Sequence, residues 1–177
     1  MPYNCTRPLK LLPVIFVLSA FITGCTTNQK SVSNRPSSRP VDPQELEFRR
    51  EVVRYALALQ GSAYKYAGTS PHTGFDCSGF TSYVMRQFKV TISPASSAQS
   101  REGRAVDVKA VQPGDLIIFG KNRNNIQHVA LVIENGRKGI EVIHSTTSRG
   151  VIRENISTSS YWEPRILLAR DVLAGRR

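Results

Sequence analysis

The chain has 177 residues, with 24 lysine and arginine against 13 aspartate and glutamate side chains, which gives a formal net charge of +11. This excess favours anionic partners, although an ordinary basic surface that aids solubility accounts for it equally well. The basic residues are scattered and accompany no nucleic-acid-binding motif, which argues against a nucleic-acid-binding protein.

The N-terminus has the pattern of a bacterial lipoprotein signal. Arg7 and Lys10 precede an apolar run at residues 11–22, which is shorter than the roughly 20 residues of a membrane-spanning helix and typical of a secretory signal core. The run ends in the sequence ITGC, which resembles a lipobox. We expect residues 1–24 to be removed and Cys25 to carry lipid chains, which anchor stably when two or three are present. The alternative is an ordinary signal peptide followed by a chance cysteine.

Residues 25–41 are expected to be the lipidated cysteine and a flexible tether. Residues 26–41 are rich in Ser, Asn, Thr and Pro and offer almost nothing apolar to bury. Thr26 stands where lipoproteins kept at the inner membrane typically have aspartate, so by resemblance we expect the periplasmic face of the outer membrane of a Gram-negative bacterium. Lipid headgroups and anionic cell wall fit the positive charge there. Residues 42–177 are long enough for one compact domain.

The cysteine count limits what the third cysteine can do. Cys5 leaves with the signal peptide and Cys25 is used by the lipid, so Cys77 alone remains in an exported, oxidising compartment. It has no partner within the mature chain, which excludes a disulfide framework. A lone thiol in that setting indicates a reactive cysteine.

Two helices are predicted in the first half of the domain. The first begins with Asp42 as N-cap and Pro43 in the first turn, has an apolar stripe at helical spacing, and ends near Gly61. Residues 62–76 are rich in Gly, Pro, Ser and Thr and predict a loop. The apolar spacing after Cys77 predicts the second helix, with Cys77 at or next to its N-terminus, where the helix dipole lowers the pKa of a cysteine from about 8.5.

The second half of the domain changes to short aliphatic runs separated by Gly, Asn and Pro. These runs predict strands at residues 115–119, 129–133, 140–143 and 165–169. Helices followed by strands in a chain of this size indicate an α+β domain, with the N-terminal helices packed on an antiparallel β-sheet.

Two of the three histidines fall in neighbouring predicted strands. Asn135 and Gly136 between them are a strong hairpin signal. An odd-length loop centred on Gly136 places His128 directly opposite His144 on one face of the sheet, whereas a two-residue Asn-Gly loop places them on opposite faces. We predict the odd loop.

A cysteine nucleophile needs a base within hydrogen-bond reach, and a third polar group that orients the base improves it. We predict Cys77 as nucleophile, His128 as base and His144 as the orienting group. Taken singly, each histidine is more often an ordinary buried or surface residue. A zinc site built from the same three side chains is the leading rival, but Cys77 has no second cysteine nearby and the spacing argues against it.

The sequence resembles the NlpC family of cell-wall cysteine peptidases, and within it the outer-membrane murein endopeptidase lipoproteins of the Spr type. The similarity covers roughly residues 45–173 and lies in the motifs AYKYAG, DCSGF, QPGDLIIF, HVALVI and VIHST. It implies a compact papain-like fold, a catalytic set on Cys77, His128 and His144, and hydrolysis of amide bonds in peptidoglycan stem peptides or their cross-links. It implies no metal or organic cofactor. An adaptor or regulatory protease is a possible partner.

The resemblance also assigns residues around the nucleophile. Tyr64 falls on the active-site tyrosine of the family, whose hydroxyl could donate to the oxyanion, and Tyr66 is its near competitor. Asp76 and Ser78 flank the nucleophile, and Asp76 is expected to tie down the turn. His72 is expected to be exposed and incidental.

Two residues depart from the family pattern and bear on substrate preference. Ala95 stands where an arginine is common, and Ala67 replaces one glycine of a Gly-Gly pair. Two alternative functions stay open. One is a domain that only binds peptidoglycan or a partner, and the other is amidase or acyl-transfer chemistry with the same cysteine.

Overall fold

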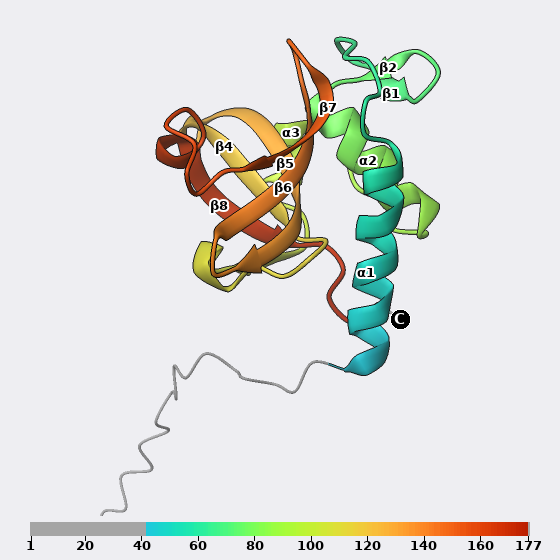
Figure 1. Ribbon diagram of the computed structural model, residues 1–177, viewed down its shortest axis with the longest axis vertical. Helices are drawn as coiled ribbons and strands as arrows, with labels where there is room; N and C mark the ends of the chain where they lie inside the picture. Colours follow the sequence, from blue (N-terminus) through green and yellow to red (C-terminus); the bar gives the residue numbers. More distant parts are fainter. Residues whose placement is uncertain (1–41, 177) are drawn as a thin grey trace, which may run out of the picture. The chain divides into compact units, whose positions relative to one another are not determined.

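The computed structural model describes residues 42–176, which form an α+β domain of helices packed on an antiparallel sheet (Figure 1). The sheet has six strands in the order β3-β8-β4-β5-β6-β7. The helices are α1 (Pro43–Ala58), α2 (Cys77–Gln87) and α3 (Ser96–Gln99). The strands of the sheet are β3 (Arg104–Val106), β4 (Leu116–Asn122), β5 (Asn125–Gly136), β6 (Gly139–Thr146), β7 (Gly150–Asn155) and β8 (Ile166–Asp171). The predicted fold class is confirmed.

The expected signal peptide, the lipidated Cys25 and the tether all lie outside the described residues. Within residues 42–176, no helix combines the length and the apolar character that crossing a membrane requires.

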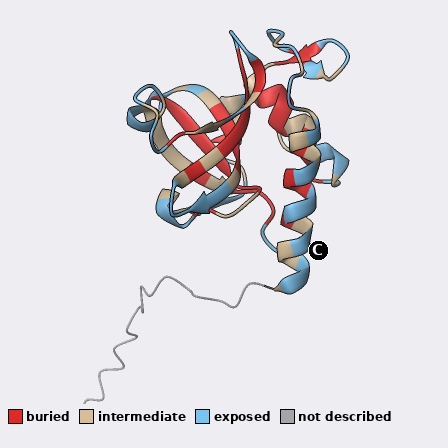
Figure 2. Ribbon diagram, in the orientation of Figure 1, coloured by how far each residue is buried: buried red, intermediate tan, exposed pale blue. Residues whose placement is uncertain are grey.

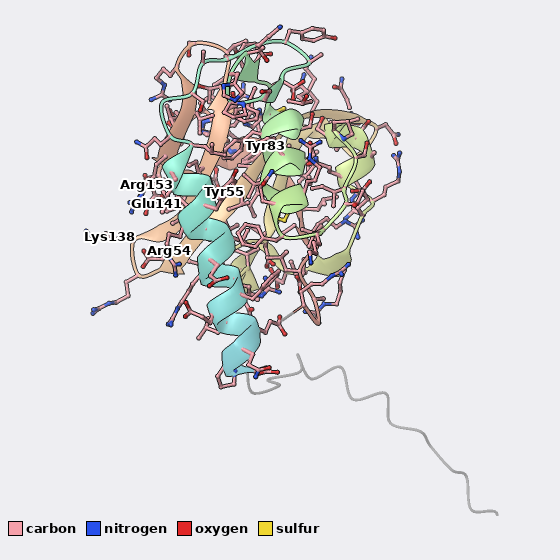
Figure 3. The ribbon with its side chains drawn as sticks, turned by 90° about the vertical axis from the view of Figure 1, so that its right-hand side faces the viewer. Arg54, Tyr55, Tyr83, Lys138, Glu141 and Arg153 are labelled. Atoms are coloured by element: carbon pink, nitrogen blue, oxygen red, sulfur yellow. The ribbon has the colours of Figure 1, made fainter. Side chains whose placement is uncertain are left out.

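Helix α1 begins as its sequence predicts. The Asp42 carboxylate accepts a hydrogen bond of 3.0 Å from the backbone N–H of Gln44, and Pro43 occupies the first turn. One side of α1 is buried, as Figure 2 shows. The ring of Tyr55 stacks on that of Tyr83 in α2, with centroids 6.5 Å apart, and both rings lie at the junction of the two helices in Figure 3. This contact packs α1 against the helix that begins at Cys77.

The four predicted strands are all present, and each extends beyond its predicted C-terminal limit. Alternate residues of the central strands enter two apolar cores on opposite faces of the sheet. Leu116, Ile118 and Leu131 belong to the core shared with α1 and α2. Ile117 and Ala130 belong to the second core. A strand buried on both faces is expected to be a continuous apolar run, as the LIIF sequence of β4 is.

Two strands of the sheet were not predicted. Strand β3 has only three residues, and β7 has the sequence GVIREN, in which two charged side chains interrupt the aliphatic pattern. Both strands lie at the edges of the sheet, where partial exposure permits polar residues. The missed strand β7 matters for the site, because it carries Glu154.

The predicted loop of the β5–β6 hairpin is wrong. Gly136 pairs with Gly139, so the turn has two residues and lies beyond the Asn-Gly pair. The Asn135 side chain instead donates hydrogen bonds to the carbonyls of Lys109 and Val111, at 3.1 and 3.2 Å. Gly139 has a φ of +104°, a conformation that favours glycine, and so supports the turn.

The face prediction for the two histidines is nevertheless confirmed. A register shift between Val132 and Glu134 inserts one extra residue into β5. This bulge restores the parity that a two-residue turn would have broken. Continuing the Leu131–Ile143 register places His144 across from Ala130, so the histidines lie on one face but diagonally rather than directly opposite.

A buried cluster of charged side chains joins α1 to the sheet. Arg49 is 1% exposed, and its guanidinium lies 2.9 Å from Asp115 and 2.7 Å from Asp171, both of which are also buried. Glu45, one turn earlier in α1, accepts from the same guanidinium at 3.0 Å. Arg104 completes the cluster at 2.8 Å from Asp171. Every carboxylate of the cluster therefore faces a permanent cation.

Candidate active site

Cys77 is the first residue of α2, as predicted, and the DCSGF motif shapes this end of the helix. Asp76 is the N-cap, and its carboxylate accepts from the backbone N–H of Gly79 at 2.6 Å and from the Ser78 hydroxyl at 3.2 Å. A Cβ on Gly79 would lie 2.0 Å from the carbonyl oxygen of Gly68, so a side chain at this position would force the loop and helix apart. Asp76 ties down the turn, as expected.

The segment before Cys77 is held against the sheet. The hydroxyl of Ser145, in β6, donates to the carbonyl of Phe75 at 2.7 Å, and both residues are buried. Phe75 also forms an isolated bridge with Tyr64. Because Ser145 directly follows His144, this hydrogen bond fixes the helix start relative to the histidines.

His128 and His144 are in direct contact. Nε2 of His128 lies 3.0 Å from Nδ1 of His144, so Nδ1 of His128 is the ring nitrogen that stays available for another group. His144 is fully buried and His128 is partly buried. The indole ring of Trp162 stacks on His128, with centroids 4.6 Å apart and an interplanar angle of 27°. The backbone N–H of Val129 is close enough to the sulfur of Cys77 to act on the pKa of the thiol by lowering it, which places the thiol beside the strand that carries His128.

A carboxylate that the sequence did not reveal lies behind His144. Oε2 of Glu154, in β7, is 3.3 Å from Nε2 of His144. The same oxygen accepts from the indole N–H of Trp162 at 2.9 Å and from the Arg149 guanidinium at 3.2 Å. The short aliphatic run after Gly150 is the one sequence signal that could have placed Glu154 on a strand beside His144.

These groups surround a cleft with a volume of about 320 Å³. It is lined by Tyr64, Cys77, Gln127, His128, Ser145, Thr146, Thr147, Ser148, Arg149, Glu154, Tyr161 and Trp162. The predicted nucleophile and base therefore open onto the same space. His144 is not among the lining residues, which fits an orienting rather than a reacting group.

Burial makes both imidazoles neutral in the free protein at neutral pH. It lowers the pKa of His128 to about 3, and the neighbouring His144 adds to this. It also lowers the pKa of His144, although the Glu154 carboxylate acts in the opposite direction. A neutral imidazole can accept a proton, as a general base must.

The expectation of a lowered cysteine pKa is wrong for the free protein. Burial raises the pKa of Cys77, and the adjacent Asp76 carboxylate raises it further. The backbone N–H groups at the helix start lower it, but their effect is smaller than that of desolvation. The thiol is therefore protonated at rest, and a base has to remove its proton before it can attack.

The geometry distinguishes between the two candidate tyrosines. Tyr64 lines the cleft, and its pKa is raised by burial and by the nearby Cys77. Tyr66 is 85% exposed and is absent from the lining. Ser78 is buried with its hydroxyl on Asp76, so its side chain serves the helix cap. His72 is exposed in the turn between β1 (Thr69–Ser70) and β2 (Gly74–Phe75), as expected.

The two departures from the family pattern differ in their surroundings. Ala67 has a φ of +53°, in the left-handed region that favours glycine, which accounts for the usual residue there. Ala95 is exposed and stands at the N-cap of α3 without a side-chain hydrogen bond to the helix. Among residues 42–176, no group of three or more His, Cys, Asp or Glu side chains is arranged to hold a metal ion.

The family profile of NlpC/P60 matches residues 61–171, which include every cleft residue named above. The chain belongs to the NlpC/P60 family.

Curated relatives fall into two groups by length. The Gamma-DL-glutamyl hydrolase of Bacillus subtilis (strain 168) is 36% identical over 126 residues, covering 70% of this chain and 30% of that protein. The Gamma-D-glutamyl-L-lysine dipeptidyl-peptidase of Bacillus cereus (strain ATCC 10987 / NRS 248) is 41% identical over 116 residues, covering 64% and 33%. The chain spans about a third of the length of these two relatives. The Murein DD-endopeptidase MepS/Murein LD-carboxypeptidase of Escherichia coli (strain K12) is 25% identical over 183 residues, covering 94% and 93%.

Solved structures confirm the fold. The crystal structure of an NlpC/P60 family protein from Bacillus cereus ATCC 10987 has a TM-score of 0.63 and 36% identity, covering 71% of this chain and 40% of that one. The NlpC/p60 domain of the peptidoglycan hydrolase SagA has a TM-score of 0.59 and 26% identity, covering 70% and 97%.

Proposed function

We propose that this protein is a cysteine endopeptidase that hydrolyses amide bonds in peptidoglycan stem peptides or their cross-links. The observation that carries the proposal is the placement of Cys77 and His128 on one cleft, with His144 3.0 Å behind His128. Relatives named as endopeptidases, peptidases and peptidoglycan hydrolases support the substrate class.

The first half-reaction makes a thioester. Nδ1 of His128 takes the proton of the Cys77 thiol as the sulfur attacks the carbonyl carbon of the amide. In this proposal the backbone N–H of Cys77 and the Tyr64 hydroxyl donate to the oxyanion that forms. The C–N bond then breaks, and His128 returns the proton to the leaving amine.

The second half-reaction restores the enzyme. Water loses a proton to His128 and attacks the thioester carbon, the C–S bond breaks, and the thiolate of Cys77 regains the proton. The products are a carboxylic acid and an amine, so no oxidant, reductant or second substrate is consumed.

The bond cleaved is either the one between D-Glu and diaminopimelate or the diaminopimelate cross-bridge. The two Bacillus relatives are named for glutamyl bonds, and the Escherichia coli relative is named a DD-endopeptidase. The match to the Escherichia coli relative covers nearly the whole of both proteins, so we favour the cross-bridge as the first substrate to test. Ala95 and Ala67 are the departures to exchange if neither bond is cut.

Purified protein incubated with defined cross-linked and uncrosslinked muropeptides tests the proposal by product mass. We expect cleavage by the wild type and none by Cys77→Ala. No cleavage by the wild type, with peptidoglycan binding unchanged by Cys77→Ala, would favour the domain that only binds peptidoglycan. Cleavage by Cys77→Ala equal to that by the wild type would show that Cys77 is not the nucleophile. Loss of the peptide from the sugar, or transfer to an added amine, would identify amidase or acyl-transfer chemistry.

We also propose that Cys25 carries the lipid that holds the protein at the periplasmic face of the outer membrane. The ITGC sequence, the apolar run before it and Thr26 after it support this address. Metabolic labelling with palmitate and membrane fractionation test it, with Cys25→Ala expected to lose both label and membrane association. Label retained by Cys25→Ala would contradict the assignment. An adaptor or regulatory protease would be sought by capture on the anchored wild type.

A further inference from the structure

Three side chains from separate segments converge on one carboxylate oxygen of Glu154. Trp162 and Arg149 donate to it at 2.9 and 3.2 Å, and Nε2 of His144 lies 3.3 Å away. The Glu154 side chain is 24% exposed, so solvent screens this group only in part. A partly buried carboxylate that meets this many donors is held in one position.

The contact with His144 involves a nitrogen that has no other partner among residues 42–176. Nε2 of His144 is fully buried and makes no hydrogen bond within this range, and the Glu154 oxygen, 3.3 Å away, is the acceptor near it. A buried N–H left without an acceptor is costly, and a buried lone pair facing a carboxylate is repelled. Either way, the carboxylate decides whether that nitrogen carries a proton.

That proton determines the tautomer of both imidazoles. If Nε2 of His144 carries hydrogen toward Glu154, its Nδ1 is an acceptor and Nε2 of His128 must be the donor across the 3.0 Å contact. Nδ1 of a neutral His128 then has no hydrogen and can accept one from a thiol. The opposite arrangement would place hydrogen on Nδ1 of His128 and leave no base for Cys77.

We propose that Glu154 is a positioning residue which, through His144, holds His128 in the tautomer whose Nδ1 accepts the proton of Cys77. Its assignment as a contributor to turnover rests on the proposed peptidase function, whereas its effect on the thiol does not. Trp162 holds the Glu154 carboxylate in place and stacks on His128, so it supports the same arrangement from a second side.

The proposal predicts how the thiol responds to pH. Glu154 favours a charged imidazole pair, whereas Arg149 opposes it and Trp162 is neutral. Removing the carboxylate charge therefore makes proton transfer from Cys77 less favourable. The alkylation profile of the thiol should move toward the higher pH at which an unassisted cysteine ionises.

The test compares Glu154→Gln with Glu141→Gln. Glu141 lies on the neighbouring strand β6, is 27% exposed and pairs with Arg153, which Figure 3 shows beside it, and it is not among the cleft residues. Iodoacetamide labelling of Cys77 is followed by mass spectrometry from pH 5 to 10. We expect Glu154→Gln to label about 10- to 100-fold more slowly at pH 7, less than the loss seen when a directly contacting orienting group is removed. Glu141→Gln should keep the wild-type profile.

A Glu154→Asp variant, which keeps the charge, should recover part of the wild-type profile. If Glu154→Gln labels at every pH as the wild type does, the proposal is overturned, even if turnover or stability falls. Because labelling needs no substrate, this outcome is distinct from a failure of the proposed peptidase function, which would appear as an absence of muropeptide cleavage by the wild type.

A second measurement uses the unmodified protein and so does not depend on the folding of a variant. Long-range ¹H–¹⁵N correlation of the imidazole rings at pH 7 should show hydrogen on Nε2 of both His128 and His144 and none on Nδ1 of either. Hydrogen on Nδ1 of His128 would contradict the assignment of Glu154.

Discussion

The cluster around Arg49 and the cleft around His128 both remove polar groups from water, but they pair them differently. Arg49 is in contact with Asp115, Asp171 and Glu45, so its charge is fully matched. The cleft and the layer behind it hold two imidazoles that burial keeps neutral and one thiol that burial keeps protonated.

Complete pairing suits a cluster that joins a helix to a sheet, because no buried charge is then left uncompensated. Removing either partner would leave such a charge. Incomplete pairing suits chemistry, because a neutral imidazole keeps a lone pair that can accept a proton, whereas the charges of the Arg49 cluster are already paired. Even within the cluster around Arg49, the carboxylates differ in the direction of their pKa shifts. Burial and the nearby Asp171 raise the pKa of Asp115 to about 6, whereas hydrogen bonds from Arg104 and Arg49 outweigh burial and lower that of Asp171.

Replacing His128 should show the difference between the two regions most clearly, because activity should fall while stability changes little. His128→Gln keeps a side chain of similar size and an N–H that can reach His144, but it has no base. We expect kcat/KM on muropeptides to fall by about 10²- to 10⁴-fold with little change in the urea midpoint at pH 7. Activity within tenfold of the wild type would show that His128 is not the base.

Arg49→Ala should have the opposite effect, lowering stability and leaving activity unchanged. It leaves two buried aspartates facing each other, and we expect the free energy of unfolding to fall by about 3–5 kcal/mol, measured in urea. The activity of the molecules that remain folded should be unchanged. Arg50→Ala is the control, since Arg50 is 62% exposed and its pair with Glu47 is 3.5 Å long, so its loss should cost less than about 1 kcal/mol. Equal effects of the two changes would contradict the distinction between a structural and a surface ion pair.

Tyr64→Phe tests the oxyanion side of the cleft. Loss of one donor to an oxyanion typically lowers kcat by about 10²- to 10³-fold, and we expect the lower end of this range because a backbone N–H stays in place. KM should change little. Tyr66→Phe is the matched control, and an effect of Tyr66→Phe as large as that of Tyr64→Phe would reverse the assignment of the two tyrosines.

The smallest effect concerns pH. The folded-state pKa of His128 lies below its ordinary value of 6.5, so the unfolded chain binds the proton first as the pH falls. Stability from this group is present above about 6.5 and is lost toward pH 3, and His144 acts in the same direction. Asp115 acts in the opposite direction, because its raised pKa gives stability that is lost as pH rises through about 6.

Urea midpoints at pH 4 and pH 7 measure the sum of these contributions. With two histidines against one aspartate, we expect the wild type to be less stable at pH 4, and His128→Gln to lose less on acidification. A variant that loses as much as the wild type would show that His128 does not titrate below its ordinary range.

Local sequence determined much of the domain. The Asp42–Pro43 start of α1, the helix that begins at Cys77 and strands β4, β5, β6 and β8 follow from caps and apolar spacing, which depend on neighbours in sequence. The residue types of the candidate site were predictable because only three histidines exist and two fall in adjacent strands. Strand β7 was missed because edge strands have weak patterns, and Glu154 was missed with it.

The sequence by itself thus determined the α+β class, the family motifs and the candidate partners of Cys77. Only the tertiary structure decided that an extra residue at Ile133 returns His144 to the face of His128, since bulges depend on contacts such as those of Asn135 with residues far along the chain. The tertiary structure also decided whether the pKa of Cys77 is raised or lowered. A helix start favours the thiolate, but burial opposes it more strongly, and burial is a property of the whole fold.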